Sequence, residues 1–235
     1  MTTQFHCARE IDLPAGASEV WRAVATTEGL AAWLFPMPIP ALGEGVTTWE
    51  PPHHLAIRME RGEWFNELDY TIDEHHGAST LRYVHRGVFV DNTDTQEAGI
   101  QQHTDFYLHT LSQSLEFFTG RRATFVGEVP NGIQGPASSA GPDRFDRLKA
   151  ALGLDPDGRA GDPVRLTPRG VDVLDGVVDY LTANFLGVRT STALWRFFGR
   201  NAFGQPVGMA IHLFDDGDPD AMSTRWQSWL DEAVG

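Results

Sequence analysis

Hydrophobic positions near the start of the chain follow two different spacings. In residues 5–14, FHCAREIDLP, apolar and polar residues alternate, which is typical of a strand. Apolar residues then recur at helical spacing in residues 20–24, and again in residues 30–34 after the interruption TTEG. We therefore predict a strand followed by two short helices, with Ser18 and Thr27 as their N-caps.

Alternating segments continue as far as residue 87. They predict four strands, separated by turn signals: VTTWE (46–50), HLAIRME (54–60), WFNELDYTIDE (64–74) and STLRYVHRG (79–87). The polar stretch DNTDTQEAG (91–99) predicts a loop. A long helix over about 101–120 should follow, with a stripe made of Leu108, Leu111, Leu115 and Phe118.

The second half of the chain is divided from the first by a stretch rich in Gly, Pro and Ser, EVPNGIQGPASSAGPD. We expect a domain over residues 1–125, a linker with a short helix over 126–162, and strands plus a helix over 163–235. GVFVDNTD with the helix after it parallels GMAIHLFDDGDPD with its own helix. A degenerate half-repeat of the first domain is therefore one interpretation of the C-terminal part.

The ordered set of segments resembles a known family. REIDLPAGASEVWRAVATTEGLAAWL, EPPHHLAIRM, GASTLRYVHRG and LEFFTGR, which together cover about residues 5–122, are similar to the START-like (SRPBCC) superfamily. The bacterial branch named after the activator of the heat-shock-protein-90 ATPase is the most similar. The resemblance implies an α+β helix-grip fold, a twisted antiparallel sheet wrapped on a long C-terminal helix. It also implies an internal cavity for a lipophilic small molecule.

Two features depart from that pattern. Between Trp33 and Pro51 the chain is too short for the extra strand pair that the family usually has there. The C-terminal α+β half-domain is an addition that single-domain members lack. We expect it to pack on the first domain, and it would complete the first sheet if an apolar edge were open.

A cavity of this kind would be lined by the inward face of the strands and by one face of the long helix. Such pockets are mostly apolar, with a few polar groups that orient the ligand. The candidate ligand-binding residues are Trp49, Ile57, Met59, Tyr70, Leu81, Tyr83, His85, Phe106, Tyr107, Thr110, Gln113 and Phe117. For the aliphatic members, core packing is the favoured interpretation, and for the polar members on apolar faces the two interpretations are nearly balanced. His85 attracts most interest, because it shares a strand face with Leu81 and Tyr83 and could orient or protonate a carbonyl.

Composition restricts the classes of partner. The 235 residues carry a formal net charge of −14, which disfavours nucleic acid and anionic membrane surfaces as partners. No apolar run is long enough to span a membrane, and the first residues lack the apolar region of a secretory signal. The single cysteine, Cys7, fits a reducing compartment and a small buried role. We expect a cytoplasmic protein.

Other chemistry finds less support in the sequence. The pairs His53-His54 and His75-His76 lack metal-chelating spacing, because neighbouring strand residues point to opposite faces. Asp105 and His109 are spaced to pair on one helix face. No GxSxG or phosphate-loop motif is present. We expect no metal and no cofactor.

Three functions therefore remain open. The first, which is the leading hypothesis, is binding of a lipophilic small molecule in an internal cavity, either without catalysis or with an activity that the sequence does not assign. The second is an aromatase/cyclase-like or hydrolytic enzyme in which His85 and the tyrosines act as acid and base groups on a bound polyketone. The third is a chaperone-associated protein that acts through its surface. A homodimer is compatible with each.

Overall fold

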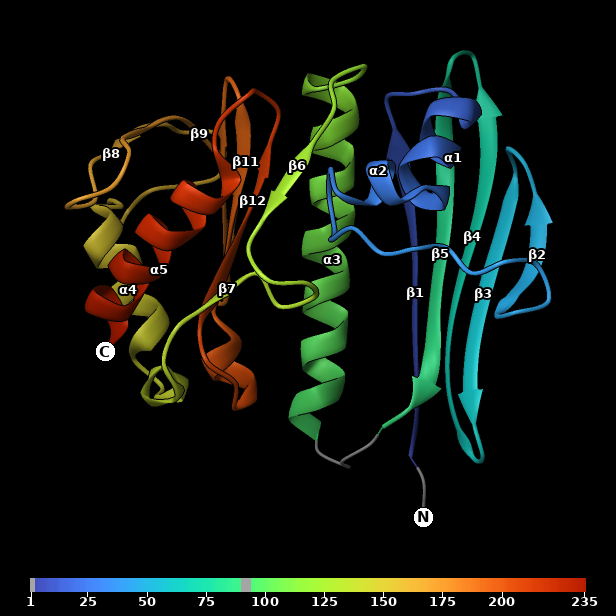
Figure 1. Cartoon of the computed structure of the whole chain (residues 1–235), viewed down its shortest axis with the longest axis horizontal. Helices are drawn as coiled ribbons and strands as arrows, with labels where there is room; N and C mark the ends of the chain where they lie inside the picture. The colour runs from blue at the N-terminus through green and yellow to red at the C-terminus, as the bar shows by residue number, and fades with distance from the viewer. Residues whose placement is uncertain (1–2, 90–93) are drawn as a thin grey trace. The chain divides into compact units, whose positions relative to one another are not determined.

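The computed structural model describes residues 3–89 and 94–235, and it divides into two compact units, Met1–Arg121 (unit 1) and Arg122–Gly235 (unit 2). The elements of unit 1 are β1 (Gln4–Leu13), α1 (Ala17–Ala25), α2 (Thr27–Leu30), β2 (Val46–Glu50), β3 (His54–Arg61), β4 (Trp64–His75), β5 (Ala78–Val88) and α3 (Asp94–Phe117). The strands form one antiparallel sheet in the order β1-β5-β4-β3-β2 (Figure 1).

The five predicted strands of unit 1 and its two short helices are confirmed, but both predicted caps lie one or two residues too late. Gly16 is the N-cap of α1, and the carboxylate of Glu74 on β4 accepts a hydrogen bond from the Ala17 N–H at 2.7 Å. Thr26, not Thr27, caps α2, since its hydroxyl accepts from the Gly29 N–H. A cap supplied from a distant strand cannot be seen in the local sequence.

The break between α1 and α2 has a steric basis. Thr26 is extended, so the chain turns there, and the backbone of Gly29 lies against that of Arg22. A Cβ on Gly29 would lie 2.0 Å from the Arg22 carbonyl oxygen, which no side chain allows. The Trp33 indole then donates to the Ala23 carbonyl oxygen at 3.0 Å and fixes the bend. The two helices close one end of the sheet (Figure 1).

The long helix α3 begins earlier than expected. The sequence indicates a polar loop over 91–99, whereas the structure is helical from Asp94 onwards. Residues 90–93, which include the first Asp-rich turn of the suggested half-repeat, lie outside the described residues. Three members of the predicted stripe, Leu108, Leu111 and Leu115, pack into the same core as the inner face of the sheet. The fourth, Phe118, is buried but follows the end of α3 and lies outside that core cluster.

Unit 2 has its own sheet. Its elements are β6 (Thr124–Val126), β7 (Ile133–Gln134), η1 (Ala137–Ala140), α4 (Arg144–Leu152), β8 (Pro163–Leu166), β9 (Leu174–Leu181), β10 (Phe185–Thr190), β11 (Ala193–Phe198), η2 (Arg200–Phe203), β12 (Gly208–Leu213) and α5 (Pro219–Val234). The strand order is β6-β12-β11-β10-β9-β8, and β7 also pairs with β12. The C-terminal strands therefore form a separate sheet and do not complete the first one.

The stretch expected to be a linker also belongs to unit 2. β6 and β7 pair with β12, which is about 80 residues further along the chain, and the buried leucines of α4 join the core of this unit. Its Gly and Pro residues shape tight turns here, and Gly132 approaches Met209 so closely that a Cβ would lie 2.3 Å from the Met209 carbonyl oxygen. Composition alone does not separate such turns from a flexible linker.

The predicted final helix is confirmed as α5. Asp218 caps it by accepting from the N–H groups of Asp220 and Ala221. Its buried Trp226 packs on Trp195 of β11, with ring centroids 4.8 Å apart, and on Trp229, with centroids 5.2 Å apart. These rings are the centre of the hydrophobic core of unit 2.

Candidate functional site

The inner face of the unit 1 sheet is the face that packs against α1 and the leucines of α3. Strand register places its side chains in rows across the sheet. The three rows farthest from α1 are Leu55-Tyr70-Tyr83-Arg9, Ile57-Leu68-His85-Cys7 and Met59-Asn66-Gly87-Phe5. Polar groups thus meet on one part of an otherwise apolar face.

Burial changes along this face. Next to α1, Leu13, Ile72 and Leu81 are fully buried. Towards the other end Leu68 and His85 are half-buried, and Met59 in the last row is 48% exposed. The inner face is therefore closed at the α1 end and also along β1, where Cys7 and Phe5 are buried, and it is exposed at the β3 corner where Met59 lies.

Tyr70 and Tyr83 face each other on β4 and β5, with ring centroids 5.2 Å apart. Burial raises the pKa of both phenols, and the neighbouring Tyr70 adds to the rise in the pKa of Tyr83. Both are therefore neutral hydrogen-bond donors at any physiological pH. Among the described residues neither hydroxyl has a hydrogen-bond partner.

His85 lies one row further along β5. Its Nε2 is 2.8 Å from Asn66 Oδ1, and its ring meets that of Phe5 edge-on at 4.8 Å. Burial lowers the pKa of His85 to about 4, so the imidazole is neutral at neutral pH. Since an amide oxygen only accepts, Nε2 carries the proton and Nδ1 is an acceptor. That Nδ1 has no hydrogen-bond partner within the described part of the chain.

Gly87 keeps Phe5 against His85. The Phe5 ring lies over Gly87 so closely that a Cβ there would be 2.7 Å from two ring carbons and 2.9 Å from the Phe65 carbonyl oxygen. Gly87→Ala should therefore displace Phe5 and reduce the free energy of unfolding by about 1–3 kcal/mol in urea titrations. Gly141→Ala is the control, because its Cβ would meet no atom closer than 3.4 Å. Equal effects of the two substitutions would contradict this packing.

An ion pair ties α3 to β1 at the same end of the sheet. The Arg9 guanidinium donates two hydrogen bonds to the Asp105 carboxylate, at 2.5 and 3.2 Å. This pair raises the pKa of Arg9, mainly through the hydrogen bond to Asp105. The sequence suggested that Asp105 pairs with His109, but the structure gives its carboxylate to Arg9 of a distant strand.

The structure places the sequence-predicted site residues in four different positions. Ile57, Tyr70, Leu81, Tyr83 and His85 lie on the inner face as expected, and Tyr107 of α3 packs against the same core. Trp49 shares this face, but it is 41% exposed at the sheet edge and packs edge-on against Trp21 of α1. Met59 lies at the exposed end of the face.

The remaining four candidates lie elsewhere on α3. At about 100° per residue, Phe106, Thr110, Gln113 and Phe117 form a stripe on the opposite side of the helix from Leu108, Leu111 and Leu115. They therefore do not line the inner face, and this part of the expectation needs correction. The sequence missed Asn66, Cys7 and Phe5 as neighbours of His85, because only the strand register brings them together.

Other groups that the sequence considered are placed at turns or edges. His53 Nδ1 lies 3.1 Å from the Ile72 carbonyl oxygen, and His54 Nε2 lies 3.2 Å from Asp69 Oδ2. Among the described residues no three His, Cys, Asp or Glu side chains are grouped to hold a metal ion. No helix within the described ranges is long and apolar enough to cross a membrane.

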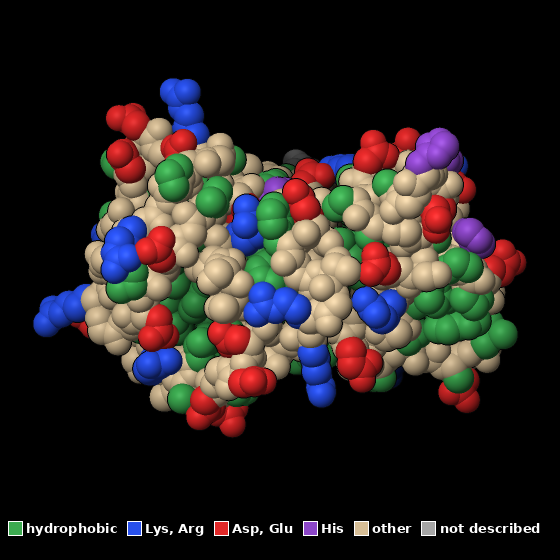
Figure 2. Space-filling model, turned by 90° about the horizontal axis from the view of Figure 1, so that it is seen from above, with side chains coloured by type: hydrophobic (Ala, Val, Ile, Leu, Met, Phe, Trp, Pro, Cys, Tyr) green, Lys and Arg blue, Asp and Glu red, His purple; other side chains and the backbone are tan. Residues whose placement is uncertain are grey.

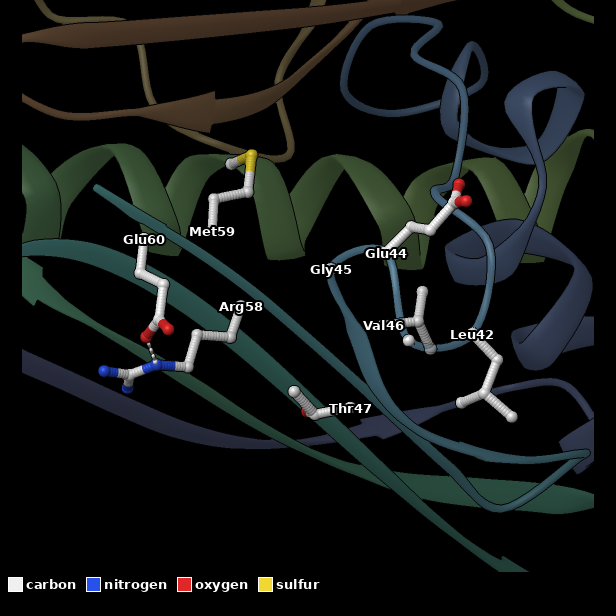
Figure 3. Close-up of a pocket in the computed structure, with 9 residues that line it drawn as sticks. Leu42, Glu44, Gly45, Val46, Thr47, Arg58, Met59 and Glu60 are labelled. Carbon is white, nitrogen blue, oxygen red and sulfur yellow. Dashed lines mark hydrogen bonds and ion pairs between the residues drawn. The ribbon is translucent and has the colours of Figure 1, made fainter. Parts of the chain in front are cut away.

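A pocket of about 750 Å³ lies at the edge of the sheet and shares Met59 with the inner face (Figure 3). Its walls are the turn that leads into β2 and the second half of β3, and the residues that line it are Leu42, Gly43, Glu44, Gly45, Val46, Thr47, Arg58, Met59 and Glu60. Figure 3 shows the side chains of Met59 and Glu44 directed to the α3 side, whereas Arg58 and Glu60 lie together on the other side of β3. Figure 2 shows hydrophobic side chains gathered over the part of unit 1 where β2 lies.

The order strand, two short helices, antiparallel strands and long helix is the order that the START-like resemblance implies. Unit 1 has this helix-grip fold, and the whole chain is α+β. No family model matches the chain, and no curated protein matches it.

Solved structures similar to the chain carry several names. The Aha1 dimer from Colwellia psychrerythraea is 17% identical with a TM-score of 0.40, and the match covers 49% of this chain and 99% of that one. CalU16 from Micromonospora echinospora is 18% identical with a TM-score of 0.38, over 49% and 84% of the two chains. Protein MLL2253 from Mesorhizobium loti is 16% identical with a TM-score of 0.39, over 48% and 97%.

Proposed function

We propose that unit 1 binds a small, mostly apolar molecule on the inner face of its sheet, with an oxygen function directed at Tyr70, Tyr83 and His85. One observation carries the proposal. The hydroxyls of Tyr70 and Tyr83 and the Nδ1 atom of His85 lie in adjacent rows, and none of these three atoms has a hydrogen-bond partner among the described residues, although His85 Nε2 is bonded to Asn66. Polar groups inside a protein are normally paired, so unpaired ones that lie together are typical of a ligand site.

The geometry suggests the chemistry of the ligand. Tyr70 and Tyr83 would donate to a carbonyl or ether oxygen, and His85 Nδ1 would accept from a hydroxyl or N–H group. Leu68, Ile57 and Met59 supply apolar surface beside them. A ligand with a donor and an acceptor on a flat hydrophobic body fits this arrangement best.

The enzyme alternative is less well supported by the same residues. General bases work best with a pKa near the operating pH, and an imidazole with a pKa of about 4 is a weak base at pH 7. A phenol whose pKa is raised by burial is likewise a weak acid. Binding without catalysis therefore remains the preferred proposal. The chaperone-associated role stays a prediction.

Substitution of Tyr83 tests the proposal. We use 6-acetyl-2-naphthol as a probe that has a hydroxyl at one end and a carbonyl at the other, and measure its affinity by calorimetry. Tyr83→Phe should weaken binding up to about tenfold, because it removes one hydrogen bond worth about 1 kcal/mol. Tyr180→Phe, the same chemical change in unit 2, should leave the affinity unchanged.

Two results would overturn the proposal. One is equal affinity of wild type and Tyr83→Phe for the probe. The other is the absence of binding for the naphthyl probe together with native mass spectra that show no small molecule on protein purified from its own host.

A further inference from the structure

The pocket at the edge of the unit 1 sheet lies beside the end of β3, beyond the point where its neighbour β2 begins. β2 pairs with β3 from Glu50↔His54 to Val46↔Ile57, and Gly45 makes the last contact, as acceptor for the Arg58 N–H at 2.7 Å. Gly45 and Gly43 have positive φ, and the chain turns away from the sheet there. β3 continues to Arg61, so within the described part of the chain its last three residues have no strand partner on this side.

The direction of the free backbone groups follows from the register. In antiparallel pairs, hydrogen-bonded and non-hydrogen-bonded positions alternate. Because Arg58 directs its N–H to the β2 side, so does Glu60, two residues further on. Met59 and Arg61 direct theirs to β4. The Glu60 N–H and C=O therefore point into the pocket, at the place where the next strand of the sheet would lie.

The side chains around this place favour a cationic partner. Among the described residues that line the pocket, the carboxylates are Glu44, on the Met59 side, and Glu60, on the other side of β3, and the one cation is Arg58. Arg58 is already paired with Glu60 at 2.9 Å and with Glu67 at 2.7 Å, and it lies over the Phe65 ring. The exposed Leu42 and Met59 add apolar surface.

We propose that this edge of β3 binds an extended peptide segment in which a Lys or Arg is flanked by apolar residues. The basic residue lies opposite Glu60, exchanges two backbone hydrogen bonds with it, and directs its side chain to the face of β3 that carries the Glu60 carboxylate. The flanking residues point to the other face, beside Met59. A second copy of this chain is disfavoured as the occupant, because antiparallel pairing about this position would place Glu60 against its own counterpart.

The probe is the peptide acetyl-Thr-Val-Lys-Val-Thr-amide, added to the full ¹⁵N-labelled chain and followed by NMR. We expect a saturable shift of the Glu60 backbone amide. Methylation of the Lys backbone nitrogen should weaken binding at least tenfold, because it removes one of the two backbone bonds. Replacement of Lys by Glu in the peptide should weaken it by a similar factor.

Substitutions in the protein distinguish the contribution of the Glu60 backbone hydrogen bond from that of the Glu60 side-chain charge. Glu60→Pro removes the N–H on an edge that tolerates Pro and should weaken binding at least tenfold. Glu60→Gln keeps the backbone N–H and removes only the side-chain charge, so it should weaken peptide binding about threefold. Glu63→Gln, in the adjacent turn and outside the pocket, is the matched control and should have no effect.

Three results would overturn the proposal. The first is no shift at Glu60 with the peptide in millimolar excess. The second is equal affinity for the Lys, Glu and N-methylated peptides. The third is concentration-dependent self-association that Glu60→Pro abolishes, with no peptide binding, since this would show that a second copy occupies the edge.

Discussion

Asp179→Asn should reduce the free energy of unfolding of unit 2 by about 3–5 kcal/mol. Asp179 on β9 and Arg196 on β11 form a buried ion pair, with side chains only 3% and 1% exposed and two contacts of 2.9 Å between guanidinium and carboxylate. The substitution keeps the shape of the side chain and removes its charge, so it leaves a buried cation without its counter-ion. Hydrogen exchange measured peptide by peptide reports the stability of each unit separately.

The same unit offers a matched control. Arg165 and Asp175 pair in the same way on neighbouring strands, but their side chains are 67% and 69% exposed. Asp175→Asn should therefore reduce the free energy of unfolding by less than 1 kcal/mol. Replacing both Arg196 and Asp179 by Met and Leu should recover most of the loss, because it removes both buried charges. If Asp179→Asn reduced the free energy of unfolding as little as Asp175→Asn, burial would not determine how much the Arg196–Asp179 pair contributes to stability.

The ion pair between Arg196 and Asp179 could not be predicted from the sequence. Within ALWRFF, Arg196 is the single charged residue of an otherwise apolar strand, which normally indicates a side chain that faces solvent. All six residues of β11 are nevertheless buried. The partner, Asp179, is 17 residues away on a strand that is not adjacent to β11, because β10 lies between them. Sequence spacing alone does not bring such residues together.

Local features of unit 1 were predictable because their causes are local. Alternation along residues 54–60 and 64–74 reflects strands that turn one face to the core, and the structure has these strands within one residue. Features that depend on distant residues were not predictable. The cap on α1 comes from Glu74, and the supposed linker is held by β12.

In the candidate site, too, the features with local causes were predictable and those that depend on distant residues were not. Tyr83 and His85 could be placed on one face because they are two residues apart on a strand. Helix α3 was harder, because it has apolar residues on two faces. Leu108 and Leu111 belong to the stripe that packs on the sheet, whereas Phe106 and Phe117 belong to the other. Periodicity detects both stripes and does not tell which one faces the sheet.

Stability should also depend on pH through His85. The ordinary pKa of 6.5 applies to the unfolded chain, and burial lowers the pKa to about 4 in the native state. Between these values the unfolded state binds more protons, so the native state loses stability as the pH falls from 6.5 towards 4. At about 1.4 kcal/mol for each pH unit, the loss is roughly 3 kcal/mol at most.

Comparison of variants isolates this contribution from that of other titrating groups. The difference in unfolding free energy between wild type and His85→Gln, measured in urea from pH 7.5 to 4.5, should shrink as the pH falls. His75→Gln, the same change at an exposed position at the end of β4, is the matched control. Parallel curves for wild type and His85→Gln would show that the imidazole is not desolvated.

The same titration connects stability with the proposed site. A ligand hydroxyl that donates to Nδ1 binds only the neutral imidazole, so bound ligand opposes protonation of His85. Saturating 6-acetyl-2-naphthol should therefore move the loss of stability to lower pH in the wild type. In His85→Gln the same probe should stabilise the protein equally at pH 7 and pH 5. If the probe changed the pH dependence of stability equally in wild type and His85→Gln, the probe would bind away from His85. The pH dependence of the ligand-free protein would be unaffected by that result.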